Sequence, residues 1–178
     1  MGERTILYGG YGANRSDEML RSITGNQLLT GKPAIFQDVE LCIQRFDQIP
    51  DTISSVAPVP KSPKSIMIES WGKSSSFETY TIRHMAGGRV AGAVFELSKV
   101  ERALIAEWEM IEFGWYKRMQ LIAVLEDGTK VTVENEGLGD NQDIDRAVDG
   151  LDYPTYLNDP TEMFKVADKA REDYLLRQ

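Results

Sequence analysis

The sequence predicts an α+β protein, in which a mixed sheet or small β-barrel carries flanking helices. Segments with the alternating or β-branched pattern of strands outnumber the helical segments. These strands are not separated by regular helical crossovers, as a doubly wound parallel sheet would require. The 178 residues suffice for one core, so we expect a single domain over residues 1–178.

The first 46 residues predict a strand, a glycine-rich turn, a helix and a second strand. The first strand covers residues 5–8 and leads into the glycine loop, defined here as residues 8–15. The helix begins near Ser16 and ends near Gly25, and apolar side chains spaced for one buried face lie within it. In the second strand, residues 39–43, apolar and polar side chains alternate.

Residues 47–65 are rich in proline and serine, which predicts an extended surface connection. Beyond it, residues 66–71 and 77–82 have the composition of two strands. We expect these two segments to form a hairpin, separated by Gly72 and the serines that follow it.

The second half of the chain begins with a strand at residues 89–97, after a turn at residues 87–88. Ser98 and Glu101 form the capping box of a helix. Its expected apolar face consists of Val100, Leu104, Trp108 and Ile111.

The remaining elements are a hairpin and a final helix. Residues 115–125 and 130–134 are expected to pair across an Asp127-Gly128 turn, and an acidic loop follows. Asp159 and Pro160 are the cap and first residue of a C-terminal helix from about residue 160.

Composition disfavours several classes of partner. Twenty Lys and Arg against 28 Asp and Glu give a net charge of −8, which opposes binding to nucleic acid or to an anionic membrane surface. The single Cys42 excludes an internal disulfide and favours a reducing compartment. Residues 1–5 lead directly into a short strand, which is too brief to be the apolar region of a signal peptide. No apolar run reaches the length needed to cross a bilayer. We therefore expect a cytoplasmic protein, and its oligomeric state is left open.

Cofactor and metal motifs are absent from the sequence. The glycine loop has Arg15 where a dinucleotide fingerprint needs its third glycine, and no Gly-Lys-Ser/Thr phosphate loop occurs. His84 is the only histidine and has no cysteine or second histidine to complete a metal site, so a structural or surface role is expected. We predict no metal and no cofactor.

Acidic side chains next to aromatic ones are the candidate chemical groups. Glu107, Glu109 and Glu112 lie at the end of the predicted helix, beside four aromatic residues between positions 108 and 116. A carboxylate among aromatic rings loses hydration, its pKa rises, and it can transfer a proton near neutral pH. The alternative is a solvated helix end with three exposed acids.

Three motifs resemble the γ-glutamylcyclotransferase-like family. Residues 8–15, Tyr-Gly-Gly-Tyr-Gly-Ala-Asn-Arg, resemble its Tyr-x-x-Tyr-Gly-Ser-Asn-Leu loop. Residues 105–110, Ile-Ala-Glu-Trp-Glu-Met, resemble its Leu-Asp-x-x-Glu-Gly segment, and residues 116–118 match its Tyr-x-Arg. The strand at 90–97 and the Asp-Gly hairpin also fall at the places that the family's order of elements would give them. The likeness extends from about residue 8 to 134, and residues 47–85 match poorly.

This resemblance implies a reaction. A γ-glutamyl group is cyclised to 5-oxoproline with release of an amine or amino acid, so the implied partner is a small γ-glutamyl substrate and no cofactor is needed. Glu109 is implied as the single general acid/base. By helical period, Glu107 falls on the apolar stripe and is the fallback. The implied substrate-binding residues are Tyr8, Gly9, Gly10, Tyr11, Gly12, Ala13, Asn14, Tyr116 and Tyr156, with Tyr156 closing the pocket and backbone amides of the loop holding substrate oxygens.

The sequence departs from the family pattern at four positions. Ala13 replaces serine, Arg15 replaces leucine, Ala106 replaces aspartate, and Met110 replaces the glycine after the acid. These departures leave open a non-catalytic protein of the same fold that binds a small metabolite or a protein. A third possibility is that the Pro/Ser-rich segment docks a partner. The γ-glutamyl compound itself is not specified, because leaving-group selectivity would come from residues 47–85.

Overall fold

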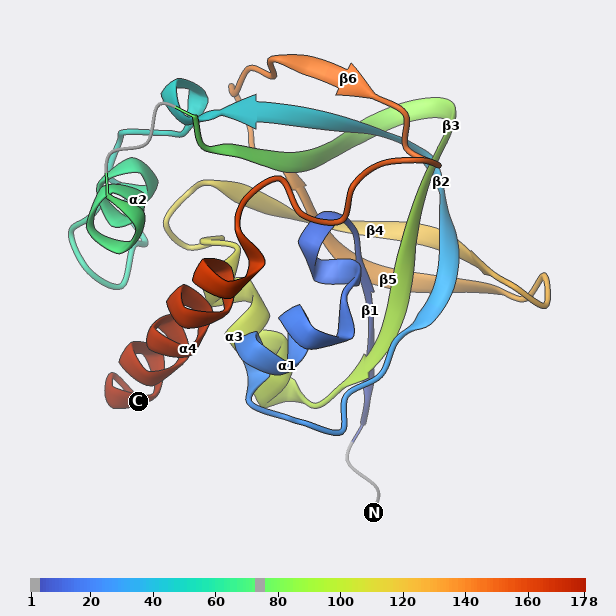
Figure 1. Cartoon of the computed structure of the whole chain (residues 1–178), viewed down its shortest axis with the longest axis horizontal. Helices are drawn as coiled ribbons and strands as arrows, with labels where there is room; N and C mark the ends of the chain where they lie inside the picture. The colour runs from blue at the N-terminus through green and yellow to red at the C-terminus, as the bar shows by residue number, and fades with distance from the viewer. Residues whose placement is uncertain (1–3, 73–75) are drawn as a thin grey trace.

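A closed five-stranded barrel forms the centre of the computed structural model, which describes residues 4–72 and 76–178 (Figure 1). Its strands are β1 (Ile6–Gly10), β2 (Lys32–Arg45), β3 (Glu78–Leu97), β4 (Tyr116–Leu125) and β5 (Lys130–Leu138). They are ordered β3-β1-β5-β4-β2, and pairing of β3 with β2 closes the barrel. β1 and β5 pair in parallel, whereas the other pairs are antiparallel. The predicted mixed-sheet barrel is therefore confirmed.

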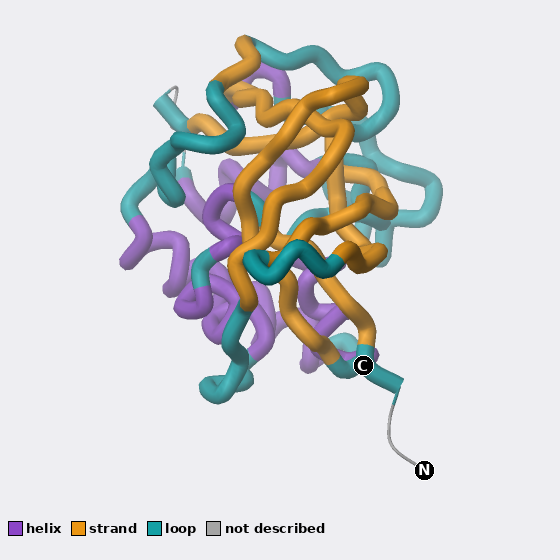
Figure 2. Tube along the Cα trace, turned by 90° about the vertical axis from the view of Figure 1, so that its right-hand side faces the viewer, coloured by secondary structure: helices purple, strands orange, loops and turns teal. Residues whose placement is uncertain are grey.

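Four α-helices occur within the described residues, and three of them lie together on one flank of the barrel. α1 (Asp17–Thr24), α3 (Lys99–Trp108) and α4 (Pro160–Leu176) lie together, whereas α2 (Pro63–Trp71) lies apart, near one end of β2 and β3 (Figure 1). Figure 2 shows the strands as one body with helices beside it. No helix in the described ranges is both long and apolar enough to cross a membrane. The remaining elements are 3₁₀ turns η1 (Gly12–Arg15) and η2 (Phe46–Gln48), and the short strand β6 (Arg146–Val148), which pairs with β2.

The helix boundaries follow from capping side chains. The hydroxyl of Ser16 accepts a hydrogen bond from the amide of Met19 at the start of α1, and Gly25 ends α1 in a left-handed conformation with φ 77°. At α3, both halves of the predicted Ser98–Glu101 capping box are formed. Asp159 caps α4, as the sequence predicts.

Two apolar clusters hold these layers together. One fills the barrel and includes the alternating side chains of the predicted strand at 39–43. The other lies between the barrel and α1, α3 and α4, and includes Met19, Leu20 and Ile23 of α1. Because these three α1 side chains are almost fully buried, the helices are fixed on the barrel by one continuous apolar layer.

The predicted hairpin of residues 66–71 and 77–82 is wrong in its first half, because residues 63–71 form α2. Ser62 accepts a hydrogen bond from the amide of Ser65, and Pro63 occupies the first helical turn, where no amide hydrogen is needed. Met67 is buried on this helix, and Trp71 packs against Phe77. The part of the expected turn at residues 73–75 lies outside the described residues.

Two smaller expectations are also wrong. The turn at residues 87–88 is a register shift within the single strand β3, where the amide of Gly87 donates to the side chain of Asp38. Val100 is 60% exposed, so its place on the apolar face was wrong, whereas Leu104 is buried as predicted; Arg102 and Ile105 are buried beside it. The burial of Arg102 bears directly on the site described next.

Candidate active site

A cavity of about 470 Å³ lies between the glycine loop, the end of α3, α2 and α4. This volume is in the range of small-molecule sites. The loop contributes Tyr8, Tyr11, Ala13 and Asn14 to its lining. Glu109 lines the same cavity, so the two segments that the motifs single out meet in one space.

Asn14 connects the glycine loop to Glu109. Its side-chain amide donates a hydrogen bond of 2.6 Å to Oε1 of Glu109 and one of 3.1 Å to the hydroxyl of Tyr8. Asn14 and Tyr8 are both buried. Because an amide nitrogen donates two hydrogens, Asn14 fixes the carboxyl group and the phenol relative to each other.

The setting of Glu109 favours its neutral form. Withdrawal from bulk water raises the pKa of Glu109 to about 8, and the nearby carboxylate of Glu136 acts in the same direction. The hydrogen bond from Asn14 and the charge of Arg102 oppose the rise. A carboxyl group with a pKa in this range can both accept and return a proton near neutral pH.

Glu107 has a different environment from Glu109. It forms an ion pair with Arg177 near the end of α4, on the wall of the cavity. Its hydrogen-bond partner is thus a cation, and among the described residues no hydrogen bond or ion pair joins it to the glycine loop. The geometry separates the two acids that the sequence left open, because Glu109 alone is bonded to the loop.

The backbone conformation after Glu109 bears on one departure from the family pattern, the replacement of glycine by Met110. Met110 has a left-handed conformation, with φ 51°, which glycine adopts without strain and other residues adopt at a cost of about 1 kcal/mol. Despite this replacement of glycine, the carboxyl group of Glu109 still reaches Asn14. Met110 packs at the edge of an apolar cluster with Ile49, Met67 and Trp115.

The glycines of the loop serve close packing. A Cβ at Gly10 would lie 2.0 Å from the carbonyl oxygen of Asn14, and Gly12 has φ 58° and lies against Tyr80. Gly9, Gly10 and Gly12 are not in the cavity lining. The amide of Gly12 donates to the hydroxyl of Tyr153, and that of Asn14 donates to the carbonyl of Tyr11. Two of the amides expected to hold substrate oxygens are therefore bonded within the protein.

The two predicted tyrosines outside the loop lie in different places. Tyr116 lines the cavity, and its hydroxyl donates to the carbonyl of Tyr80; burial and the charge of Glu109 raise its pKa. Tyr156 instead faces a separate, open cavity, and its hydroxyl bonds to Ser16. The prediction that Tyr156 closes the pocket disagrees with this placement.

Three residues near the site were missed by sequence reasoning. Glu136 is 1% exposed, lines the cavity and forms an ion pair with the buried Arg102. The predicted strand ended at residue 134, so Glu136 fell in an expected acidic loop. Tyr153 supports the loop from below, since its hydroxyl also donates to the carbonyl of Ala91 and Arg15 lies over its ring. No local sequence signal indicates either contact.

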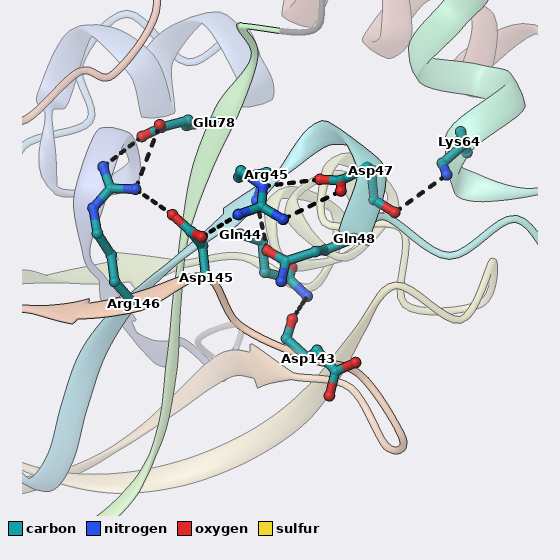
Figure 3. A network of polar contacts seen from close by, with 9 residues as sticks. All are labelled: Gln44, Arg45, Asp47, Gln48, Lys64, Glu78, Asp143, Asp145 and Arg146. Carbon is teal, nitrogen blue, oxygen red and sulfur yellow. Dashed lines mark hydrogen bonds and ion pairs between the residues drawn. The ribbon is translucent and has the colours of Figure 1, made fainter.

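A polar network connects the elements beside the cavity (Figure 3). Arg146 of β6 pairs with Asp145 and with Glu78, which lies at the start of β3 and lines the cavity. Arg45 at the end of β2 pairs with Asp145 and Asp47. These side chains are partly exposed, so each pair contributes little alone, but together they join the ends of β2, β3 and β6.

The described residues contain no cluster of three or more His, Cys, Asp or Glu side chains suited to a metal ion. The cavity lining supplies side chains capable of proton transfer and hydrogen bonding, among them Asn14, Glu109 and Tyr116. They can position a small polar ligand and exchange a proton with it through Glu109.

Solved structures share this fold. A gamma-glutamyl cyclotransferase superimposes with a TM-score of 0.54 and 20% identity, over 79% of this chain and 70% of that one. An uncharacterized protein from Homo sapiens gives a TM-score of 0.56 and 20% identity, over 80% and 70% of the two chains. No protein-family model and no curated protein matches the sequence. The comparisons thus establish the fold.

Proposed function

We propose that this chain, which has the γ-glutamylcyclotransferase-like fold, converts a γ-glutamyl compound to 5-oxoproline and a free amine. The observation that carries the proposal is the contact between Asn14 and Glu109 in a shared cavity, where a carboxyl group with a pKa of about 8 is bonded to the glycine loop. The resemblance of the loop and of residues 105–110 to the family motifs supports the same assignment.

The proposed reaction is an intramolecular acyl transfer. The α-amine of the substrate attacks its own γ-carbonyl carbon, a new C–N bond closes the five-membered ring, and the amide bond to the leaving amine breaks. Both reacting groups belong to one molecule, so the protein needs only to fold the substrate and move protons. No bond forms between substrate and protein in this scheme.

Glu109 would carry the proton in two steps. Its carboxylate first removes a proton from the α-ammonium group, which frees the nitrogen lone pair for attack. The resulting carboxylic acid then protonates the leaving nitrogen as the C–N bond breaks. The attacking nitrogen gives up its second proton as the lactam forms, and that proton leaves with the released amine as its ammonium ion. With a pKa of about 8, about one tenth of the molecules hold the ionised form at pH 7.

The cavity wall suggests where the leaving group would lie. Asn14 and Glu109 line the cavity beside Tyr8 of β1, whereas Trp71 of α2 and Met163 of α4 come from the surrounding helices. We assign the γ-glutamyl part to the loop side and the leaving amine to the helical side. Residues 63–71, which match the family poorly, would then influence which amine is accepted.

The direct test is to incubate the purified protein with γ-glutamyl amino acids and γ-glutamyl amines and to measure 5-oxoproline by mass spectrometry. Formation of 5-oxoproline from at least one compound is expected. If no compound in a broad panel yields the product, while thermal unfolding shows the protein to be folded, the enzymatic proposal fails.

The alternative function is binding of a small metabolite without turnover. It is favoured by the Gly12 and Asn14 amides, which are bonded internally and so leave the loop fewer donors for a developing negative charge. This alternative predicts that γ-glutamyl compounds raise the unfolding temperature and are recovered unchanged.

A further inference from the structure

We propose that Arg102 and Glu136 form a positioning pair for Glu109, in which Glu136 keeps a negative charge beside the acid while Arg102 holds Glu136 and the ring of Tyr8 in place. This inference rests on the proposed function for its catalytic meaning. Its physical content, an interaction between two buried carboxyl groups, is tested without turnover.

The first observation is a layer of contacts beneath Glu109. The guanidinium of Arg102 lies 5.1 Å from the centre of the Tyr8 ring and forms an ion pair with Glu136. The hydroxyl of Tyr8 accepts from Asn14, which also donates to Glu109. The contacts therefore run without a gap from Arg102 to the acid.

The second observation is the division of charge between the two carboxyl groups. Glu136 and Glu109 line the same cavity. Glu136 contacts the cation of Arg102, whereas Glu109 is bonded to a neutral amide. Two nearby carboxyl groups do not both ionise readily in a site removed from water. Burial raises the pKa of Glu136 as well, but the charge and hydrogen bond of Arg102 oppose that rise. Because Glu136 alone of the two contacts the cation, the negative charge belongs on Glu136 and the proton on Glu109.

The ionisable groups around Glu109 show which charges act on its pKa. Tyr8 and Tyr11 come from the loop side and Tyr116 from β4, and burial raises the pKa of each phenol, so these groups are neutral. The charged groups are Glu136 of β5, Arg102 and Glu107 of α3, Lys169, Asp173 and Arg177 at α4, and, elsewhere in the lining, Lys61, Glu69 of α2 and Glu78 of β3. Four ion pairs neutralise most of these groups: Glu107 with Arg177, Lys169 with Asp173, Lys61 with Glu69, and Glu78 with Arg146. The remaining charges are Glu136, which raises the pKa of Glu109, and Arg102, which lowers it less.

The burial of the pair supports a role beyond stability. The side chains of Arg102 and Glu136 are 4% and 2% exposed. A buried ion pair often stabilises a fold no better than apolar residues of the same size. A core that required only stability could therefore hold two apolar side chains here, whereas a positioning role requires the charges.

The test measures the protonation of Glu109 directly. The protein is labelled with ¹³C at glutamate side chains, the Glu109 signal is assigned by its loss in Glu109→Gln, and its chemical shift is followed from pH 4 to pH 10. In Glu136→Gln the midpoint of Glu109 is expected to fall by about one pH unit or more, because a repelling charge is gone and Arg102 is unopposed.

A second variant addresses the risk that Glu136→Gln does not fold. The double variant Arg102→Met with Glu136→Met replaces both charges by apolar side chains of similar length. Its Glu109 midpoint is expected between those of Glu136→Gln and the wild type, since both influences are removed together. Glu134→Gln is the matched control: Glu134 also contacts Arg102 but is 40% exposed, so water screens it and its removal shifts the midpoint less than Glu136→Gln does.

The outcomes separate the two proposals. An unchanged Glu109 midpoint in the double variant, or a fall in Glu134→Gln as large as in Glu136→Gln, overturns the positioning pair whether or not the protein forms 5-oxoproline. The expected order of midpoints in a protein that forms no 5-oxoproline supports the pair and removes only the proposed reaction.

Discussion

The side-chain amide of Asn14 lies 2.6 Å from Oε1 of Glu109, although 95 positions separate the two residues in the chain. This hydrogen bond joins the loop after β1 to the end of α3 inside one cavity. The proposed chemistry depends on this contact, and the following predictions test its consequences.

Replacing Glu109 by glutamine should lower kcat/KM for 5-oxoproline formation by about 100-fold or more, because general acid–base groups contribute factors of this size. Glu107→Gln is the matched control. It removes a carboxylate of the same helix that pairs with Arg177 and should leave turnover close to wild type. The opposite pattern, with Glu107→Gln inactive and Glu109→Gln active, would assign the acid to Glu107.

The pH dependence of kcat/KM should show a rising limb with a midpoint near pH 8, the pKa of Glu109. The ionised form is the one that accepts a proton from the substrate, so the rate should fall about tenfold per pH unit below the midpoint. Initial rates between pH 5 and pH 9 measure this. A profile that is flat from pH 6 to pH 9 contradicts the assigned pKa.

Protonation of Glu109 should also make stability depend on pH. Its pKa rises from 4.5 in the unfolded chain to about 8 in the folded protein, so the folded state holds the proton more tightly. The stabilising contribution is complete below pH 4.5 and is lost as the pH rises toward 8. Glu109→Gln has no proton to lose, and its unfolding temperature relative to wild type should therefore increase from pH 5 to pH 9. A constant difference across this range argues against the raised pKa.

The left-handed backbone at Met110 predicts an order of stability among variants. Met110→Ala loses the packing of the side chain and keeps the strain, whereas Met110→Gly loses the same packing and removes the strain. Glycine should therefore give the more stable protein by about 1 kcal/mol, measured by urea unfolding. If alanine is the more stable variant, the left-handed conformation is not strained as described.

Truncation of Trp71 tests the proposed location of the leaving group. Trp71→Ala widens the helical side of the cavity and removes the contact with Phe77. KM for a γ-glutamyl compound with a large apolar amine should rise by about 10-fold, whereas that for γ-glutamyl methylamide should change little. Equal effects on both substrates place the leaving group elsewhere.

Local patterns predicted much of the fold because the forces behind them act over a few residues. The Ser98–Glu101 capping box and the Asp159 cap of α4 formed as expected. The alternation at residues 39–43 correctly identified part of a strand, although β2 is longer than expected and is buried on both faces at residues 41–43. The first half of the predicted hairpin was wrong, because a short apolar run fits a strand or a buried helix equally well, and the Ser62–Pro63 start signal of α2 was read as part of an extended connection.

The residues of the candidate site were harder to predict from the sequence than the fold was. Glu109 and Asn14 lie in motifs, and their meeting could be expected from the family resemblance. Glu136 and Arg102 could not, because a charged residue in a strand or on a helix is exposed in most proteins. Their burial depends on the pairing of β5 with β1 and on the packing of α3 against β1 and β3, which no short segment encodes.

The Tyr153 hydroxyl, which bonds to both the amide of Gly12 and the carbonyl of Ala91, has a consequence for biosynthesis. The glycine loop is synthesised before its support, because Tyr153 follows Gly12 by 141 positions. The nascent chain must therefore hold an incomplete loop until Tyr153 has been made. A release of stalled chains before residue 153 should yield products whose loop is digested by proteases, even where the first three barrel strands have already been synthesised.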